Sequence, residues 1–185
     1  MDGVGQPVEV RPVTPERWRD LVALFERPGP RGGTPMPGAG CWCMWWRQRT
    51  GDAARNKEAM HALVTEGLEP GLLAYAEGVP VGWVSVGRRE HFGQLMRSPQ
   101  YKPRDDDADV FAIVCFYVDP GWKRCGVAIS LLDSAVEWAR LRGATAIEAY
   151  PNLKPDFMGR LEAFERHGFS RTRTAGKRVV VCLAL

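Results

Sequence analysis

The sequence predicts a single α/β domain over residues 1–185, built on a mixed sheet, and three observations lead to this fold class. At 185 residues, the chain is long enough for one hydrophobic core and short for two. Strand-like and helix-like segments alternate along it without an internal repeat. The segment Val110–Val118 is nearly all apolar, as expected for a central strand that is covered on both faces.

The first third of the chain predicts a strand, two helical regions and a loop between them. Residues 8–13 alternate as a short strand does, and Thr14 with Pro15 provides a helix N-cap and a first helical position. Residues 28–40 are so rich in proline and glycine that we expect a loop. A second helical region is predicted over residues 45–67, with a break near its Thr-Gly pair.

The remaining two thirds predict a hairpin, a polar loop and then alternating strands and helices. Residues 72–76 and 81–86 read as strands joined by a tight Glu77-Gly78 turn, and residues 90–109 as a polar loop. The later segments are expected to be a strand over 110–118, a helix ending at Gly143, a strand over 146–150, a helix over 158–167 ended by Gly168, and a strand over 179–185.

Composition restricts the class of protein. The hydrophobic share of 45% and the charged share of 25% are those of an ordinary globular protein. No apolar run is long enough to cross a bilayer, and the N-terminus MDGVGQPVEV lacks the basic and apolar regions of a signal peptide, so we expect a cytoplasmic protein with no membrane partner. Five cysteines favour reduced thiols over a disulfide framework, and a net charge of +3 argues against a nucleic-acid partner.

A basic, glycine-containing turn joins the apolar strand to the next helix. The first turns of a helix expose backbone N–H groups and partial positive charge, which favour an anion. Gly126 lets a phosphate approach the backbone closely, and Lys123 and Arg124 add formal charge. The local residues alone leave open the alternative that this is a helix start that merely happens to be basic.

Two segments resemble the GNAT superfamily of N-acetyltransferases. The stretch VDPGWKRCGVA, from Val118 to Ala128, resembles the pyrophosphate-binding motif [Q/R]-x-x-G-x-[G/A] of that superfamily, and AFERHGF, from Ala163 to Phe169, resembles a later motif. The order of the predicted elements also matches over nearly the whole chain. The resemblance implies a GNAT-like fold, whose central sheet is mixed and mostly antiparallel with helices on both faces. It also implies acetyl-CoA as co-substrate and, as one possible assembly, a homodimer.

The same resemblance assigns residues to the cofactor. The pyrophosphate is expected at Lys123 and at the backbone amides of the loop and first helical turn, which are those of Arg124, Cys125, Gly126, Val127, Ala128 and Ile129. Tyr117 and Val118 are expected to bind the pantetheine arm and to direct a backbone N–H at the thioester carbonyl. Asn152 is expected near the cofactor, with a turn asparagine as the alternative.

The sequence departs from the GNAT pattern at three places. Lys123 stands where glutamine or arginine is usual, which keeps the positive charge. Phe164 stands where many members carry a tyrosine that protonates the leaving thiolate, and phenylalanine donates no proton. Val114 and Cys115 fall where a catalytic glutamate is often found. The catalytic residues therefore have to be sought elsewhere in this chain.

Acetyl transfer to an amine needs a base for the ammonium form and an acid for the leaving thiolate. Glu90, Asp109 and Glu148 are candidates for the base, with Glu148 preferred because it shares a strand face with Tyr150, the candidate acid. The alternatives are a surface carboxylate and a core tyrosine. Cys115 is a conceivable nucleophile, but a small buried side chain is the more ordinary role for it.

The segment GAGCWCMWWRQR combines three tryptophans with a cysteine pair. We expect Trp42, Trp45 and Trp46 to form an aromatic wall of the acceptor pocket, with plain packing against the sheet as an equally weighted alternative. Cys41 and Cys43 supply only two ligands and do not have the C-x-x-C redox spacing, so we expect no metal site.

The sequence therefore predicts an acetyl-CoA-dependent N-acetyltransferase that acts on a primary amine of a small molecule by direct attack in a ternary complex. Two other functions stay open at this point. One is acetyl transfer to a macromolecule, either a protein amine or an aminoacyl-tRNA. The other is a non-catalytic acyl-CoA-binding protein, because the usual glutamate and tyrosine are missing.

Overall fold

Seven strands form one sheet, in the order β1-β2-β3-β4-β5-β7-β6, in a computed structural model that describes residues 8–28, 40–48, 50–103, 109–154 and 156–185. Neighbouring strands are antiparallel except β4 and β5, which run parallel, so the mixed and mostly antiparallel sheet is confirmed. The strands are β1 (Glu9–Pro12), β2 (Gly71–Ala76), β3 (Val79–Arg88), β4 (Val110–Val118), β5 (Ala146–Ala149), β6 (Ser170–Ala175) and β7 (Arg178–Ala184).

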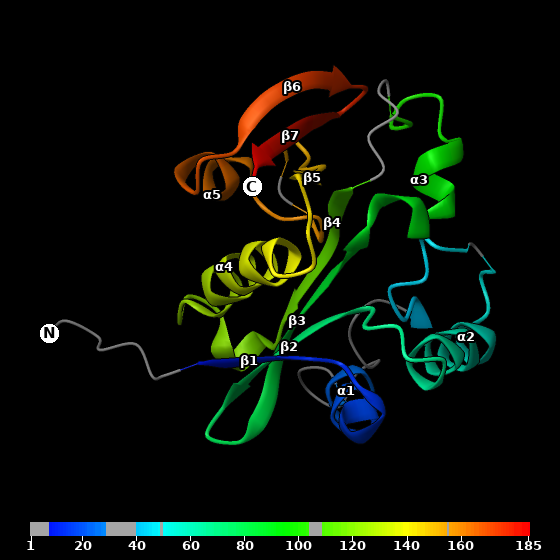
Figure 1. Cartoon of the computed structure of the whole chain (residues 1–185). Coiled ribbons are helices and arrows are strands. Elements are labelled where there is room, and N and C mark those ends of the chain that lie inside the picture. Colours follow the sequence, from blue (N-terminus) through cyan, green and yellow to red (C-terminus); the bar gives the residue numbers. More distant parts are fainter. Residues whose placement is uncertain (1–7, 29–39, 49, 104–108, 155) are drawn as a thin grey trace, which may run out of the picture.

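Helices cover both faces of the sheet, as Figure 1 shows. On one face, α4 and α5 pack against the sheet through residues such as Leu131 and Phe164, and on the other face α1 and α2 pack through residues such as Leu24 and Met60. The helices are α1 (Trp18–Phe25), α2 (Ala53–Thr65), α3 (Gly93–Arg97), α4 (Val127–Arg140) and α5 (Leu161–Arg166), with short 3-10 turns at Pro15–Arg17, Arg89–His91 and Pro120–Trp122.

Local sequence signals account for where several of these elements turn, begin or end. Glu77 and Gly78, in the turn between β2 and β3, both have positive φ, as a two-residue type I′ hairpin requires. The Asp52 side chain caps α2 by accepting a hydrogen bond from the N–H of Arg55 at 2.9 Å. Gly143 follows α4 in the left-handed conformation and ends it.

Strand β4 contains a bulge that positions the site. Cys115 pairs with Ser85 and Ile113 pairs with Val86, so Val114 is an extra residue without a partner on β3. Val114 and Cys115 consequently face the same side of the sheet, the side covered by α1 and α2, although side chains of a regular strand alternate. Beyond the bulge, Tyr117 lies on that side as well.

The structure corrects three of the predicted elements. Strand β6, over Ser170–Ala175, was missed because its polar side chains are mostly exposed at a sheet edge and give no apolar alternation. The predicted loop over 90–109 contains α3, and residues 45–47 form turns instead of a helix. Most of the predicted 28–40 loop, and the aspartate run inside 90–109, lie outside the described residues. Within the described ranges, no helix is both long and apolar enough to cross a membrane.

Candidate active site

A cavity of about 700 Å³ lies between the Cys41–Trp46 segment and the second half of β4. Its lining residues come from distant parts of the chain, so the fold alone brings them together. Those from the first segment are Cys41, Cys43, Trp45 and Trp46. Those from β4 and the turn after it are Cys115, Phe116, Tyr117, Val118, Pro120 and Lys123, and Phe157 and Arg178 complete the set.

In the described parts of the chain, no strand pairs with the β4 edge that lines this cavity. Pairing between β4 and β5 ends at Ile113 and Ala149, whereas β4 continues to Val118. The N–H of Phe116 points to this open edge, because it donates to the carbonyl of Phe157 at 2.6 Å. Since N–H groups along a strand alternate between its two edges, that of Val118 also faces the open edge.

Tyr117 contributes to the cavity through its side chain instead of its backbone. Its N–H faces β3, as the alternation along β4 requires and as the bond from Asp119 N–H to the Val81 carbonyl indicates. Its ring is 9% exposed and meets the Phe25 ring edge-on. Of the two residues predicted at the splay, therefore, only Val118 has its N–H on the open edge.

The basic loop before α4 leads into backbone N–H groups that have no carbonyl acceptor among the described residues. Arg124 and Gly126 both have positive φ, at 66° and 80°, and the chain then enters α4 directly. Within the described part of the chain, the N–H groups of Val127 and Ala128 have no carbonyl acceptor, as expected for the first turn of a helix. Ile129 differs from the prediction, because its N–H donates to the carbonyl of Gly126 at 3.0 Å.

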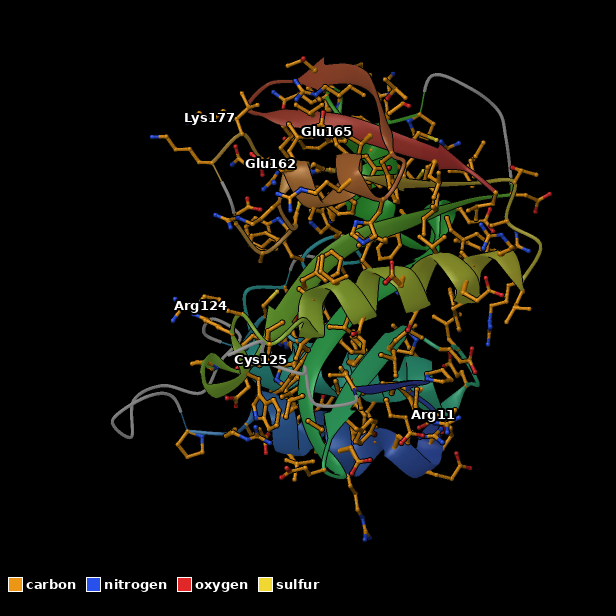
Figure 2. The ribbon with its side chains drawn as sticks, turned by 90° about the vertical axis from the view of Figure 1, so that its left-hand side faces the viewer. Arg11, Arg124, Cys125, Glu162, Glu165 and Lys177 are labelled. Carbon is orange, nitrogen blue, oxygen red and sulfur yellow. The ribbon has the colours of Figure 1, made fainter. Side chains whose placement is uncertain are left out.

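The charged and reactive side chains of this loop lie on the surface. Figure 2 shows Arg124 and Cys125 at the N-terminal end of α4, directed away from the sheet. Lys123 is exposed too and also lines the cavity, so the loop and the cavity are continuous. A Cβ added at Gly126 would meet no atom within 4 Å, so the space in front of its Cα is open. This space beside a helix N-terminus is of the kind that suits an anion.

The three tryptophans separate into two roles. Trp45 is 43% exposed and Trp46 is 7% exposed, and both line the cavity as predicted for a wall. Trp42 differs from the prediction, because its indole is buried between the rings of Trp18 and Phe25 in the core beneath α1. The alternative of plain packing therefore describes Trp42.

Glu148 and Tyr150 lie side by side but away from the cavity. The Tyr150 hydroxyl donates to Glu148 Oε2 at 2.7 Å, and Arg89 Nη1 lies 3.3 Å from the same oxygen. Glu148 is 6% exposed and Tyr150 is fully buried. Burial and then the Glu148 carboxylate raise the pKa of Tyr150 well above its usual range, which makes it a weaker proton donor. This geometry favours a structural network over the predicted base and acid.

The other candidate bases are also placed away from the cavity lining. Asp109 forms a surface ion pair with Arg88 at 2.9 Å. Glu90 lies in the short 3-10 turn after β3. Neither is among the described residues that line the cavity.

The contacts of Asn152 and Phe164 stabilise a turn and the core, respectively. The Asn152 side chain accepts from Lys154 N–H and donates to Asp156, so it holds the turn after β5 together. Phe164 is 1% exposed and meets the rings of Phe116 and Phe169 edge-on. The turn-asparagine alternative thus has direct contacts in its support.

No group of three or more histidine, cysteine, aspartate or glutamate side chains in the described ranges is placed to hold a metal ion. All five cysteines lie in those ranges, and none of them forms a disulfide. Three of the five line the cavity, a grouping that spacing along the sequence does not reveal.

A sequence model of the acetyltransferase (GNAT) family matches residues 39–169, which is more than half of the chain. The chain belongs to this family. It is accordingly an N-acetyltransferase that uses acetyl-CoA as co-substrate. No protein of curated function matches the sequence significantly.

Solved structures show the same fold at low sequence identity. The GNAT domain of PAT from S. lividans superposes with a TM-score of 0.61 at 20% identity, over 96% of this chain and 90% of that one. PaiA N-acetyltransferase from Thermoplasma acidophilum, in complex with coenzyme A, gives 0.55 at 11% identity over 97% and 99%. The NatC complex bound to Gag peptide and CoA gives 0.58 at 11% identity over 96% and 98%.

Proposed function

We propose that this GNAT protein transfers the acetyl group of acetyl-CoA to a primary amine of a small molecule by direct attack in a ternary complex. The observation that carries the proposal is one continuous cavity. It begins at Lys123 beside the helix start, follows the open edge of β4 and ends at the aromatic side chains of Trp45 and Trp46. A donor and an acceptor bound at its two ends would meet at the β4 edge.

The cofactor end is assigned to the loop from Lys123 to Ala128. The pyrophosphate would accept hydrogen bonds from the N–H groups of Val127 and Ala128, strengthened by the partial positive charge of the α4 N-terminus. Lys123 and Arg124 add formal charge at the surface, where salt screens it. The pantetheine arm would then lie along the open edge of β4, towards Phe116.

The reaction at the β4 edge depends mainly on orientation. We assign the N–H of Val118 to the thioester oxygen, where it stabilises the negative charge that develops as the amine attacks. The C–N bond forms, the C–S bond breaks, and the thiolate of coenzyme A takes a proton. The described lining residues include no carboxylate or imidazole, so we assign removal of the proton from the amine to water in the cavity.

The acceptor end favours an amine attached to an apolar or planar body. Its described walls are the indoles of Trp45 and Trp46, the ring of Phe157 and cysteine side chains, together with Arg178, whose charge is paired with Asp156. Aromatic faces also attract a cationic amine before it loses its proton. A cavity of about 700 Å³ matches the size of small-molecule sites, which is the reason for preferring a small acceptor to a macromolecule. A cytoplasmic location is part of the proposal, because five cysteines without a disulfide suit a reducing compartment.

The test is a screen of amines with acetyl-CoA, followed by the release of free thiol. Small aromatic and alkyl amines, peptides with a free N-terminus and aminoacyl-tRNA form the three arms. Turnover confined to small amines supports the proposal. Turnover only with peptides or aminoacyl-tRNA would show that the acceptor is a macromolecule and not a small amine. Binding of acetyl-CoA without any turnover would favour the non-catalytic alternative.

A further inference from the structure

Two cysteine sulfurs meet in the wall of the cavity. Cys43 Sγ, from the first segment, lies 3.2 Å from Cys115 Sγ, on β4. Both residues are more than nine-tenths buried, and both line the cavity. A disulfide has an S–S bond of about 2.0 Å, so a movement of roughly 1.2 Å would join the two sulfurs.

The backbone on each side is shaped in a way that produces this contact. The β4 bulge turns Cys115 towards the side of the sheet that carries the first segment. Trp42 and Cys43 both adopt positive φ, at 48° and 52°, a conformation that is costly for residues other than glycine. Strained backbone of this kind persists only where the surroundings enforce it, and here it aims Cys43 at β4.

A third residue holds the pair in place. The indole N–H of Trp83, which is fully buried on β3, donates to Cys43 Sγ at 3.0 Å. The hydrogen bond with Cys43, followed by burial, raises the pKa of Cys115, so Cys115 stays a thiol. Cys115 is therefore the protonated partner of the pair, beside a Cys43 sulfur that Trp83 holds in place.

We propose that Cys43 and Cys115 form a reversible disulfide across the wall of the cavity, and that this bond stops acetyl transfer while coenzyme A still binds. The second half of this statement rests on the proposed function. The oxidant is a small peroxide that enters through the cavity, which both sulfurs line.

The chemistry balances with hydrogen peroxide as the oxidant. The Cys43 thiolate attacks one peroxide oxygen and the O–O bond breaks, which gives a sulfenic acid and one water after proton transfer. The Cys115 thiol then attacks the Cys43 sulfur, the S–S bond forms, and the second oxygen leaves as water. Each sulfur is oxidised by one electron and the peroxide is reduced by two. A small dithiol reverses the bond by exchange.

The disulfide would act on the acceptor end of the cavity. It would tie the segment that carries Trp45 and Trp46 to β4, one residue before Phe116, and so fix and reshape the wall at that end of the cavity. The loop from Lys123 to Ala128 lies beyond this point, so its phosphate site stays open. Oxidation would thus exclude the acceptor and leave the cofactor bound.

The experiment treats the folded protein with hydrogen peroxide, blocks the remaining thiols and identifies linked peptides by mass spectrometry without reduction. We expect a Cys43–Cys115 link that a dithiol removes. The link should be absent from Cys43→Ser and from Cys115→Ser, and it should persist in the control Cys182→Ser, on β7. If a variant does not fold, the linked peptides of the wild-type protein alone still show whether Cys43 and Cys115 form a disulfide. No link, or a link that joins Cys41 or another partner in its place, would overturn the proposal.

Activity provides the second readout. Peroxide should remove most of the thiol-release activity of the wild-type protein with coenzyme A affinity changed less than twofold, and a dithiol should restore it. The activity that remains in Cys43→Ser should not respond to peroxide. Full activity of the linked protein would overturn the switching half of the proposal. A link in a protein that turns over no amine would instead count against the proposed function and leave the disulfide standing.

Discussion

Replacement of Gly126 by tryptophan should abolish binding of coenzyme A while the protein stays folded. A Cβ added at Gly126 would meet no atom within 4 Å, and Gly126 is exposed, so the new side chain starts from open space. The remaining cost is the left-handed backbone at φ 80°, about 1–2 kcal/mol for a residue other than glycine. In a chain of this size, that cost lowers the melting temperature by about 2–8 °C.

The effect on binding is expected to be much larger than the effect on stability. The indole would cover the N–H groups of Val127 and Ala128, where each charge-assisted hydrogen bond to a phosphate contributes about 1.5–3 kcal/mol. Loss of both would weaken binding by about 3–6 kcal/mol, or roughly 10²- to 10⁴-fold.

Gly143, at the other end of α4, supplies the matched control. It has φ 77°, and a Cβ added there would also meet no atom within 4 Å, so Gly143→Trp carries the same backbone strain far from the loop. The assay is the rise in melting temperature with increasing coenzyme A, measured for both variants and the wild-type protein. We expect the rise to vanish in Gly126→Trp and to remain in Gly143→Trp. An unchanged rise in folded Gly126→Trp would refute the placement of the phosphate.

Three further predictions concern the core and the buried charges. Phe164→Ala should cost about 3–5 kcal/mol of unfolding free energy in urea, with activity per folded molecule largely kept, because Phe164 is 1% exposed; a loss of turnover at normal stability would contradict this. Glu148→Gln should cost about 3–5 kcal/mol, because it breaks the buried ion pair between Glu148 and Arg89; a fall in kcat at unchanged stability would instead assign Glu148 to catalysis. Burial and then the charge of Arg47 lower the pKa of His91 in the folded protein. As the pH decreases below about 6.5, the unfolded state therefore binds more protons than the folded state, and the free energy of unfolding should decrease. That fall should be smaller in His91→Gln, and an identical pH profile would exclude His91 as its source.

Local sequence signals predicted the elements that carry their own pattern. The apolar run of Val110–Val118 coincides with β4, and Gly126 and Gly143 flank α4 as expected. The family was predictable from the residues, because the two motifs that carry the resemblance, at Val118–Ala128 and Ala163–Phe169, each consist of consecutive positions.

The features that sequence reasoning missed depend on contacts between distant segments or on unusual backbone. Nothing in a uniformly apolar strand marks Val114 as the bulged residue, although the bulge decides which way Cys115 faces. The positive φ of Trp42 and Cys43 is equally invisible, and it places one tryptophan in the core and one sulfur at the cavity. Glu148 was expected near the chemistry because it shares a strand face with Tyr150, and that local pattern does not reveal its buried partner Arg89, which lies far away in the sequence.

The most direct test of the central claim is a calorimetric titration of the wild-type protein with acetyl-CoA and with coenzyme A, at low and at moderate salt. The claim is that the loop from Lys123 to Ala128 and the open edge of β4 together hold the cofactor. We expect saturable binding of both compounds with one site per chain, weakened by salt because Lys123 and Arg124 are exposed. Absence of binding to the folded protein would contradict the account.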